Sequence, residues 1–392
     1  MANVARKLLV DIHSHVYLPR YAALLRSRST APRIKTLAPS GEERLLILDN
    51  EPSGGRPVGP QYWDRDEKLK FMNQHGIDVT VVSTANPWLD FLGPSEAIEL
   101  AEKLNEDLEE YCATSPVIPA SKSTPDPSGD TLRRIYAFGL LPLVPGIPSD
   151  ALIESISKIR TLPHVRGIIL GTQGLGKGLD DPQLDSLWAA ISDAGLVVFL
   201  HPHYGVDSNA WGEKDNGHVL PLALGFPFET TVATTRLILA GVLDRHPALK
   251  LLLAHSGGAL PALSSRLSSC ITHDPVVASR LKHDARHYLG KLYLDAVAYG
   301  PEELGFASDV IGRAGSYSAS PEVLPMTLEE KRSKGAKQML FGTDHPFFPP
   351  LSTQEKWQSV TENLKAINEV QGWSEQDRDG VRGGNAVRLF GL

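Results

Sequence analysis

The stretch LLVDIHSHVY, which begins at Leu8, holds two histidines one residue apart behind a run of apolar residues. Side chains of a strand alternate between its two faces, so His13 and His15 point to the same side. Each imidazole carries a donor and an acceptor that need partners, so the pair would pack poorly in an apolar core. Because imidazole is a common zinc ligand, the pair predicts half of a metal site, although H-x-H also occurs among surface histidines.

More histidines and one aspartate follow other apolar runs, each at the point where the run ends. They are His201 and His203 in FLHPHYG, His255 in LLLAHSGG, and Asp344 and His345 in LFGTDHPFFPP. One histidine at the end of a strand is usually a hydrogen-bonded structural residue. Four strands that all end in His or Asp are better explained by side chains that converge on one divalent cation.

Eight apolar runs rich in Leu, Ile and Val provide the strands that would position these side chains. They begin at Leu8, Val79, Ile135, Val165, Leu196, Leu249, Lys291 and Gln338. Apolar runs bounded by polar residues are typical of parallel strands buried on both faces. Segments with helical patterns lie between them, at 94–113, 150–160, 185–195 and 230–247.

Eight strands that alternate with helices predict an α/β fold, the (β/α)8 or TIM barrel, in which the C-terminal ends of all strands share one rim. A doubly wound open sheet is the alternative, but it would need a glycine-rich phosphate turn after the first strand. That strand ends instead in H-S-H. The barrel therefore brings the candidate ligands to one mouth.

We expect residues 1–392 to form a single barrel domain with three insertions or loops, at 20–65, 114–133 and 313–337. None of these segments has the periodicity of a barrel element, and 114–133 is rich in Pro, Ser and Thr. We expect 20–65 to fold over the mouth of the barrel or to pack against a partner.

The composition limits the classes of function. The chain has 392 residues, of which 42% are hydrophobic and 22% charged, which is enough for a large core. The net charge of −7 argues against a nucleic-acid partner. Cys112 and Cys270 lie far apart without C-x-x-C spacing, which argues against a disulfide framework. No apolar stretch has the length of a membrane span, so we expect a cytoplasmic protein without a membrane partner.

These motifs resemble those of the amidohydrolase superfamily, and within it the decarboxylase branch typified by aminocarboxymuconate-semialdehyde decarboxylase. The resemblance covers most of the chain, from VDIHSH through ANPW, FLHPHYG, GFPFETT and LLLAHSGGALP to GTDHPFF. The strings LGTQGLGKGLDDP, HVLPLALGFP and FGTDHPFFPP are most similar to fungal isoorotate (uracil-5-carboxylate) decarboxylases. The aminocarboxymuconate enzymes tend to carry tryptophans near FLHPHYG and HVLPLALG, and this departure favours the pyrimidine acid.

The resemblance implies an amidohydrolase-type barrel with one zinc ion, or alternatively manganese. The implied metal ligands are His13, His15, His201 and Asp344. Asp344 would also deliver a proton to the substrate, and His255 would orient the substrate or relay protons. The strand that begins at Val165 ends in IILGTQG without the bridging lysine of binuclear hydrolases, which favours a single metal.

Six further residues are candidates for substrate binding. They are Arg56, Asn86, His203, His218, Arg266 and Phe347. Arg56 would meet the substrate carboxylate and Phe347 would stack on a planar ring. Arg266 matches the family arginine that reaches the site of a neighbouring subunit, which implies a homodimer. A solvated surface charge is the alternative interpretation of both arginines.

The predicted function is non-oxidative decarboxylation, by a carboxy-lyase, of a planar unsaturated or aromatic acid, with isoorotate as the favoured substrate. Aminocarboxymuconate semialdehyde and hydroxybenzoate-type acids are alternative substrates. A mononuclear zinc hydrolase of the same barrel is a rival, because both reactions use a Lewis acid. A noncatalytic barrel is a second rival, although it would be expected to lose at least one ligand.

Overall fold

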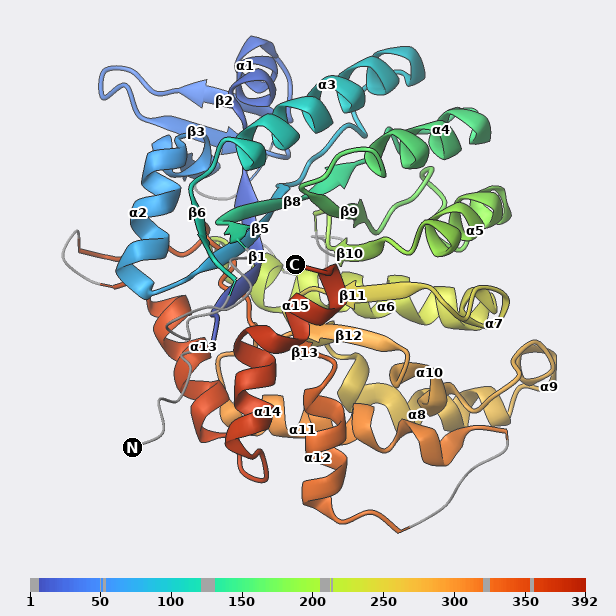
Figure 1. The fold of residues 1–392 in the computed structure, drawn as a ribbon. Coiled ribbons are helices and arrows are strands. Elements are labelled where there is room, and N and C mark those ends of the chain that lie inside the picture. Colours follow the sequence, from blue (N-terminus) through green and yellow to red (C-terminus); the bar gives the residue numbers. More distant parts are fainter. Residues whose placement is uncertain are drawn as a thin grey trace, which may run out of the picture.

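The computed structural model describes residues 7–392 except 50, 52–53, 121–130, 205–211, 213, 320–324 and 353–355. Its central sheet has eight parallel strands, which correspond to the eight apolar runs of the sequence (Figure 1). In spatial order they are β1 (Val10–Val16), β5 (Val79–Thr84), β8 (Ile135–Leu140), β9 (Val165–Gly171), β10 (Val197–His201), β11 (Lys250–Leu253), β12 (Leu292–Asp295) and β13 (Met339–Leu340). The order in space equals the order in the chain, as in a barrel.

The sheet closes where the last strand meets the first. Ile12 donates its backbone N–H to the carbonyl of Phe341 at 3.0 Å, and His15 donates to the carbonyl of His345 at 2.7 Å. The predicted (β/α)8 barrel is thus confirmed, although β13 itself has only two residues. The residues that follow it continue the pairing with β1 and carry Asp344 to the mouth.

Helices connect the strands and surround the barrel (Figure 1). The main ones are α2 (Arg65–His75), α3 (Pro94–Ala113), α4 (Ser149–Ile159), α5 (Asp185–Ala194), α6 (Phe226–Leu239), α7 (Val242–Arg245), α8 (Leu260–Thr272), α11 (Pro301–Gly312) and α13 (Gln358–Glu369). The helix expected over 230–247 begins earlier and is interrupted. Pro227 fits the first turn of α6, and Gly241, with φ of 68°, separates α6 from α7.

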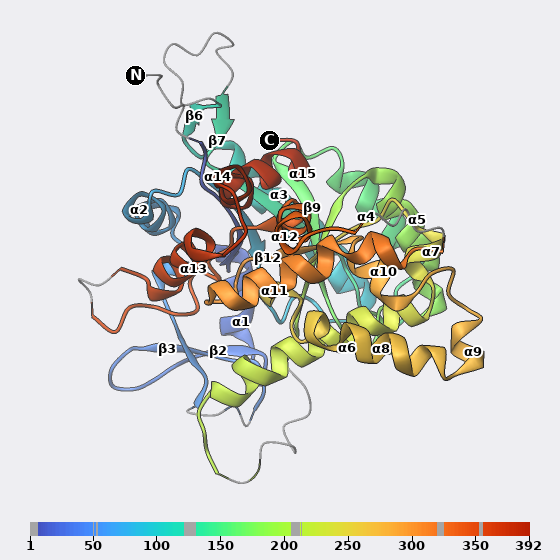
Figure 2. The ribbon, with the colours of Figure 1, turned by 90° about the horizontal axis from the view of Figure 1, so that it is seen from below.

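The segment 20–65 contains its own small structure. After α1 (Pro19–Ser27) it forms an antiparallel sheet of β2 (Arg33–Thr36), β3 (Glu43–Leu46) and β4 (Arg56–Val58). The segment 114–133 forms a second ribbon of β6 (Val117–Pro119) and β7 (Thr131–Arg133), and residues 121–130 lie outside the described part. Figure 2 shows these two inserted sheets at opposite ends of the barrel.

The rest of the chain covers the last strands. The segment 313–337 contains α12 (Leu328–Ala336), which begins at a capping box of Thr327 and Glu330 and packs on α11. The short helices α9 (Pro275–Ala278), α10 (Ala285–Leu289), α14 (Glu375–Asp379) and α15 (Asn385–Phe390) complete the structure.

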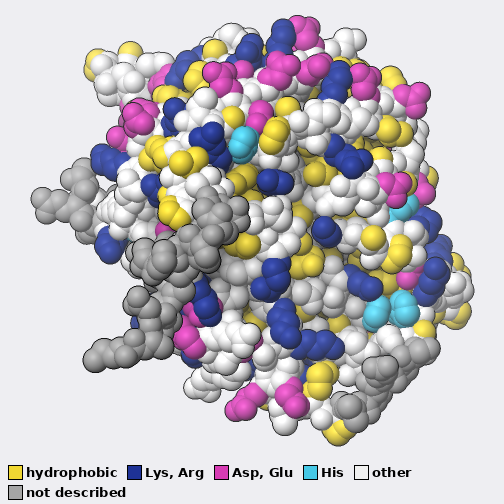
Figure 3. Space-filling view, viewed as in Figure 1, with side chains coloured by type: hydrophobic (Ala, Val, Ile, Leu, Met, Phe, Trp, Pro, Cys, Tyr) yellow, Lys and Arg dark blue, Asp and Glu magenta, His cyan; other side chains and the backbone are white. Residues whose placement is uncertain are grey.

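Charged side chains of both signs lie on the face seen in Figure 3, with Lys and Arg most frequent in its middle. None of the helices in the described part of the chain has the length and hydropathy of a transmembrane segment.

A buried lysine stabilises the seam between β1 and the segment after β13. Lys68 of α2 is fully buried, and its Nζ donates to Ser14 Oγ at 2.7 Å and to the carbonyl of His15 at 3.0 Å. Nζ also lies 2.7 Å from His345 Nδ1. Burial lowers the pKa of Lys68 to about 7, against the opposing charge of Asp11. The ammonium therefore serves three acceptors that lie next to candidate metal ligands.

We expect Lys68→Met to lower the free energy of unfolding by about 3 kcal/mol, because it leaves Asp11 and these acceptors buried without their cationic partner. Urea unfolding followed by circular dichroism measures the change. Lys70→Met is the matched control, since the Lys70 side chain is 74% exposed and its loss should cost no more than about 0.5 kcal/mol. Equal effects of the two substitutions would contradict the role of Lys68.

Candidate active site

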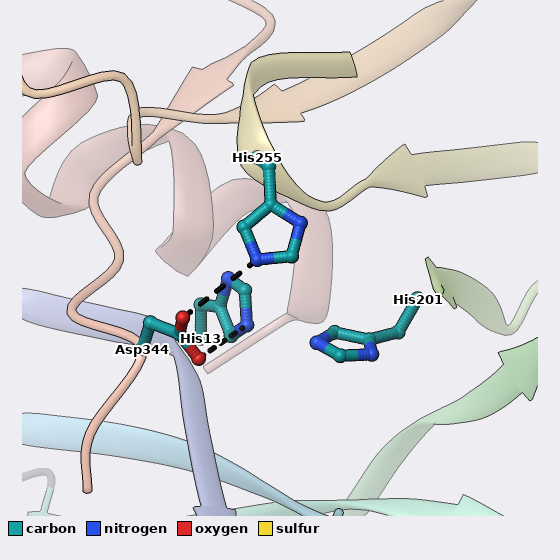
Figure 4. A group of neighbouring side chains, drawn as sticks. All are labelled: His13, His201, His255 and Asp344. Carbon is teal, nitrogen blue, oxygen red and sulfur yellow. Dashed lines mark ion pairs between the residues drawn. The ribbon is translucent and has the colours of Figure 1, made fainter. Parts of the chain in front are cut away.

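The side chains at the strand ends meet at the mouth of the barrel. His13 and His15 come from β1, His201 ends β10, and His255 and Asp344 follow β11 and β13. Figure 4 shows four of them pointing toward one another. In His13, His201, His255 and Asp344, one ligand atom of each residue lies within 4.8 Å of those of the others. We call these four residues, together with His15, the mouth cluster.

His15 belongs to the mouth cluster through its contacts with His13 and Asp344. The Nε2 atoms of His13 and His15 are 3.0 Å apart, and Asp344 Oδ1 lies 3.3 Å from each. On its other side, Asp344 places Oδ2 3.7 Å from His255 Nε2. One carboxylate thus faces three imidazoles, in an arrangement that a divalent cation between them would stabilise.

The outer nitrogen of three of these imidazoles is already engaged by the protein. His13 Nδ1 lies 2.6 Å from Asp295 Oδ2, His15 Nδ1 lies 3.0 Å from Ser83 Oγ, and His201 Nδ1 lies 2.9 Å from the carbonyl of Pro202. A carboxylate or carbonyl partner requires the proton on Nδ1, which leaves the lone pair on Nε2. His201 Nε2 is buried and has no hydrogen-bond partner within the described residues. This donor set fits a divalent metal ion.

The charges of the mouth cluster agree with this fit. Burial lowers the pKa of His13, but the carboxylates of Asp344 and Asp295 outweigh it and raise that pKa to about 10. Burial raises the pKa of Asp344, but the charge of His13 outweighs it and holds that pKa well below its usual range. Burial lowers the pKa of His15 to about 4 and that of His201 well below its usual range. His15 and His201 are therefore neutral imidazoles, whereas the carboxylates of Asp344 and Asp295 favour a positive charge at His13, the side of the cluster where a cation would bind.

Whether His15 or His255 is the fourth metal ligand stays a prediction. The four residues whose ligand atoms all lie within 4.8 Å of one another include His255, whereas the resemblance implies His15 in its place. His255 Nδ1 is buried and has no hydrogen-bond partner among the described residues. His255 also has a positive φ of 53°, and Asp344 has a φ of 56°, conformations that cost energy and are frequent at functional sites.

Sequence reasoning missed Asp295, the residue that ends β12. It is fully buried and accepts hydrogen bonds from the ring of His13 and from the backbone N–H of His255. Burial raises its pKa, but the hydrogen bond and charge of His13 outweigh this, so the pKa is lowered. Its position in the sequence could have identified it, because KLYLDAV places an acid at the end of the seventh apolar run, where other runs carry the candidate ligands.

Two predicted substrate-binding residues lie beside the mouth cluster. The ring of Phe347 is 5.2 Å from that of His15, and the Arg56 guanidinium lies 4.8 Å from the Phe347 ring. Arg56 comes from β4, so the inserted sheet delivers a cation close to the mouth. Its Nε is 3.7 Å from Glu51, a carboxylate that also lies 3.3 Å from His218 Nε2.

Asn86, which follows β5, contacts His203, which follows β10. His203 Nε2 is 3.1 Å from Asp90 Oδ2, and its ring makes an edge contact with Trp88. The Asn86 amide donates to the carbonyl of His203, while its Oδ1 is buried without a hydrogen-bond partner among the described residues. His203 therefore has its own acidic partner, and Asn86 has an unused acceptor.

A cavity of about 730 Å³ leads from the mouth cluster toward α6, α8 and α11. His255, Asp344 and His218 provide polar groups to its lining, and Leu222, Phe226, Tyr299, Phe306 and Phe348 provide apolar ones. This size and lining are typical of a site for a small organic molecule. Arg266 does not line the cavity and is exposed on α8, so the structure does not bring it to the site of its own chain.

Comparisons with known proteins agree with this geometry. The crystal structure of Metarhizium anisopliae IDCase in apo form is 38% identical, covers 98% of this chain and 97% of that chain, and has a TM-score of 0.82. The 2-amino-3-carboxymuconate-6-semialdehyde decarboxylase of Dictyostelium discoideum is 24% identical over 99% of this chain and 92% of its own length. The predicted carboxy-lyase class is confirmed, since the relatives that span the chain are named decarboxylases.

A third comparison concerns the fold. The dihydroxybenzoic acid decarboxylase of Polaromonas sp. JS666, solved with bound manganese and the inhibitor 2-nitroresorcinol, is 20% identical. It covers 99% of this chain and 98% of its own, with a TM-score of 0.66. Residues 129–392 match the amidohydrolase family, and together with the 38% identity to IDCase this match shows that the chain belongs to that family.

Proposed function

We propose that this protein is a metal-dependent decarboxylase that converts uracil-5-carboxylate (isoorotate) to uracil and CO2. One observation carries the proposal: the inward Nε2 atoms of three imidazoles and the Asp344 carboxylate meet where an apolar cavity begins. The similarity to IDCase, an isoorotate decarboxylase, supports the choice of acid. Manganese in the Polaromonas decarboxylase supports a divalent metal, either zinc or manganese.

The reaction has one difficult step that the site must address. Direct loss of CO2 from an unsaturated carbon leaves a carbanion that cannot delocalise its charge, so protonation of that carbon must come first. His13, His15, His201 and Asp344 would hold a divalent metal, which would supply a Lewis acid that orients the acid and withdraws charge. The Asp344 carboxylate would first accept a proton by way of His255, whose Nε2 lies 3.7 Å from its Oδ2, and would then transfer it to the carbon that bears the substrate carboxylate. The bond to CO2 then breaks, and its electron pair restores the double bond of the ring.

The groups around the mouth can bind a pyrimidine acid. The Nδ2 of Asn86 donates to the carbonyl of His203, which fixes the orientation of the amide and leaves Oδ1 as a buried acceptor. A ring N–H of a pyrimidine acid can donate to this atom. Arg56 pairs with the carboxylate, and Phe347 stacks on the planar ring. His203 and His218 line the walls.

Purified protein loaded with zinc or manganese is incubated with isoorotate, with 2,6-dihydroxybenzoate and with aminocarboxymuconate semialdehyde, and CO2 is measured. We expect isoorotate to give CO2 and uracil with a kcat/KM at least about tenfold above those of the other acids. Chelator-treated protein is the control. Release of CO2 from none of the acids, with hydrolysis of a lactone or amide instead, would contradict the decarboxylase and favour the hydrolase.

The same resemblance leads us to propose a homodimer in which Arg266 enters the partner's site. Arg266 is exposed on α8, and the exposed apolar side chains Leu263 and Phe306 lie on α8 and α11. We expect Arg266→Ala and Asp344→Asn to be inactive alone. When equal amounts of the two variants are refolded together, half of the dimers should contain one chain of each variant. Each mixed dimer has one intact site of two, so the mixture should show about a quarter of wild-type activity. Absence of recovery in a mixture shown to contain mixed dimers would exclude a shared site.

A further inference from the structure

Asp295 collects donors from two different parts of the mouth cluster. Its Oδ2 accepts the ring N–H of His13 at 2.6 Å and the backbone N–H of His255 at 2.9 Å. Its Oδ1 accepts the backbone N–H of Ser256 at 2.8 Å and that of Val297 at 3.1 Å. Asp295 is fully buried, so these four donors take the place of the water that an exposed carboxylate would bind.

The turn that Asp295 holds has an unfavourable backbone conformation. His255 and Ser256 have φ values of 53° and 52°, in the left-handed region that side chains with a Cβ rarely occupy. The backbone N–H groups of His255 and Ser256 both donate to the Asp295 carboxylate, so one anion binds both residues of the turn. Ser256 Oγ in turn donates to the carbonyl of Asp295 at 2.9 Å. The anion stabilises the conformation that carries the His255 ring.

We propose that Asp295 is a positioning residue that couples the candidate metal ligand His13 to the turn that carries His255. One carboxylate then sets both the orientation of the His13 lone pair and the place of His255 relative to Asp344. This inference rests on the proposed function for the roles of the two histidines. It adds a residue of β12 to a site whose candidate groups come from the other strands and their loops.

Asparagine has the size of aspartate but cannot accept hydrogen bonds at both terminal side-chain atoms. It offers one acceptor oxygen, and its amide N–H2 would meet either the ring N–H of His13 or the backbone N–H of Ser256. In D295N at least one of the two partners therefore loses its acceptor. Removal of a hydrogen-bond partner of a ligating histidine typically weakens metal binding by about 10- to 100-fold.

Two measurements on D295N test the coupling. Competition with a chromophoric chelator gives the affinity for zinc, which we expect to fall by about 10- to 100-fold. Hydrogen exchange of the metal-free protein gives the protection of the His255 and Ser256 amides, which we expect to fall by at least about tenfold. Asp11→Asn is the matched control. Asp11 is a buried carboxylate that accepts the backbone N–H of His13 but touches neither residue of the turn.

Steady-state kinetics at saturating metal separate positioning from general destabilisation. If His255 is displaced, the kcat of D295N should fall about tenfold or more while KM stays within about twofold. If D295N is only less stable, bound metal should stabilise it and its kcat should return to the wild-type value. If D295N does not fold, D295N/S256G replaces it, because glycine adopts the left-handed turn without strain. The expected losses of zinc affinity and kcat are the same.

Wild-type zinc affinity together with wild-type exchange of the turn in D295N would overturn the inference. Loss of exchange protection in D11N equal to that in D295N would also overturn it, because the turn would then not depend on Asp295 in particular. The coupling and the proposed function can fail separately. If the wild type binds zinc but decarboxylates no acid, and D295N loses both zinc affinity and exchange protection of the turn, the coupling is supported and the proposed function is contradicted.

Discussion

Replacement of Asp344 by asparagine is expected to reduce kcat by at least about a thousandfold. The carboxylate lies 3.3 Å from the Nε2 atoms of both His13 and His15 and 3.7 Å from that of His255, so it contacts three imidazoles of the mouth cluster. Asparagine has nearly the same shape but cannot carry the proton, and it binds a divalent metal more weakly. General acid catalysis alone contributes about 10²- to 10⁴-fold, and weakened metal binding adds to that loss.

Single-turnover release of CO2 from isoorotate, with metal present in excess, measures this effect. Asp193→Asn is the control, because Asp193 is exposed on α5, a helix that contributes no residue to the mouth cluster. It should keep the wild-type rate. An Asp344→Asn variant that retains wild-type turnover would show that the proton comes from another group.

Replacement of His201 by alanine is expected to remove the metal from a protein that remains folded. The ring sits at the end of β10 with Nδ1 held by the carbonyl of Pro202, and its buried Nε2 has no hydrogen-bond partner among the described residues. Loss of the ring removes a preformed ligand without breaking a side-chain network. We expect the metal content after dialysis to fall from close to one per chain to below about a tenth.

His203→Ala is the matched control for this experiment, because the two histidines lie two residues apart. His203 Nε2 has its own partner, Asp90, at 3.1 Å, and His203 is absent from the four residues whose ligand atoms converge. Elemental analysis should therefore find the metal retained in His203→Ala. If His203→Ala loses the metal while His201→Ala keeps it, the assignment of the two imidazoles is reversed.

The sequence was informative about the barrel for a physical reason. Parallel strands are buried on both faces, so each appears as a continuous apolar run, and the polar residue that ends a run lies on the rim. His13, His201, His255 and Asp344 could be brought together in this way although hundreds of residues separate the first from the last. Asp295 followed the same rule but was overlooked, because a single acid after a run resembles an ordinary loop residue.

Other contacts could not be predicted from local patterns. Lys68 lies on a helix of mostly polar residues, and nothing in its neighbours indicates that Nζ reaches His345, 277 positions away. The inserted sheet was equally hard to foresee, since β2, β3 and β4 have only three or four residues each. Such short strands carry little periodicity. Their consequence for the site, the approach of Arg56 to Phe347, depends on tertiary packing.

Anomalous diffraction at the absorption edge of the bound metal tests the central claim most directly. Crystals of the protein purified with zinc or manganese should give one strong peak per chain, within about 2.5 Å of Nε2 of His13 and His201 and of a carboxylate oxygen of Asp344. A protein that releases CO2 from isoorotate and yet gives no peak at the mouth cluster, or gives its peak elsewhere, would contradict the account.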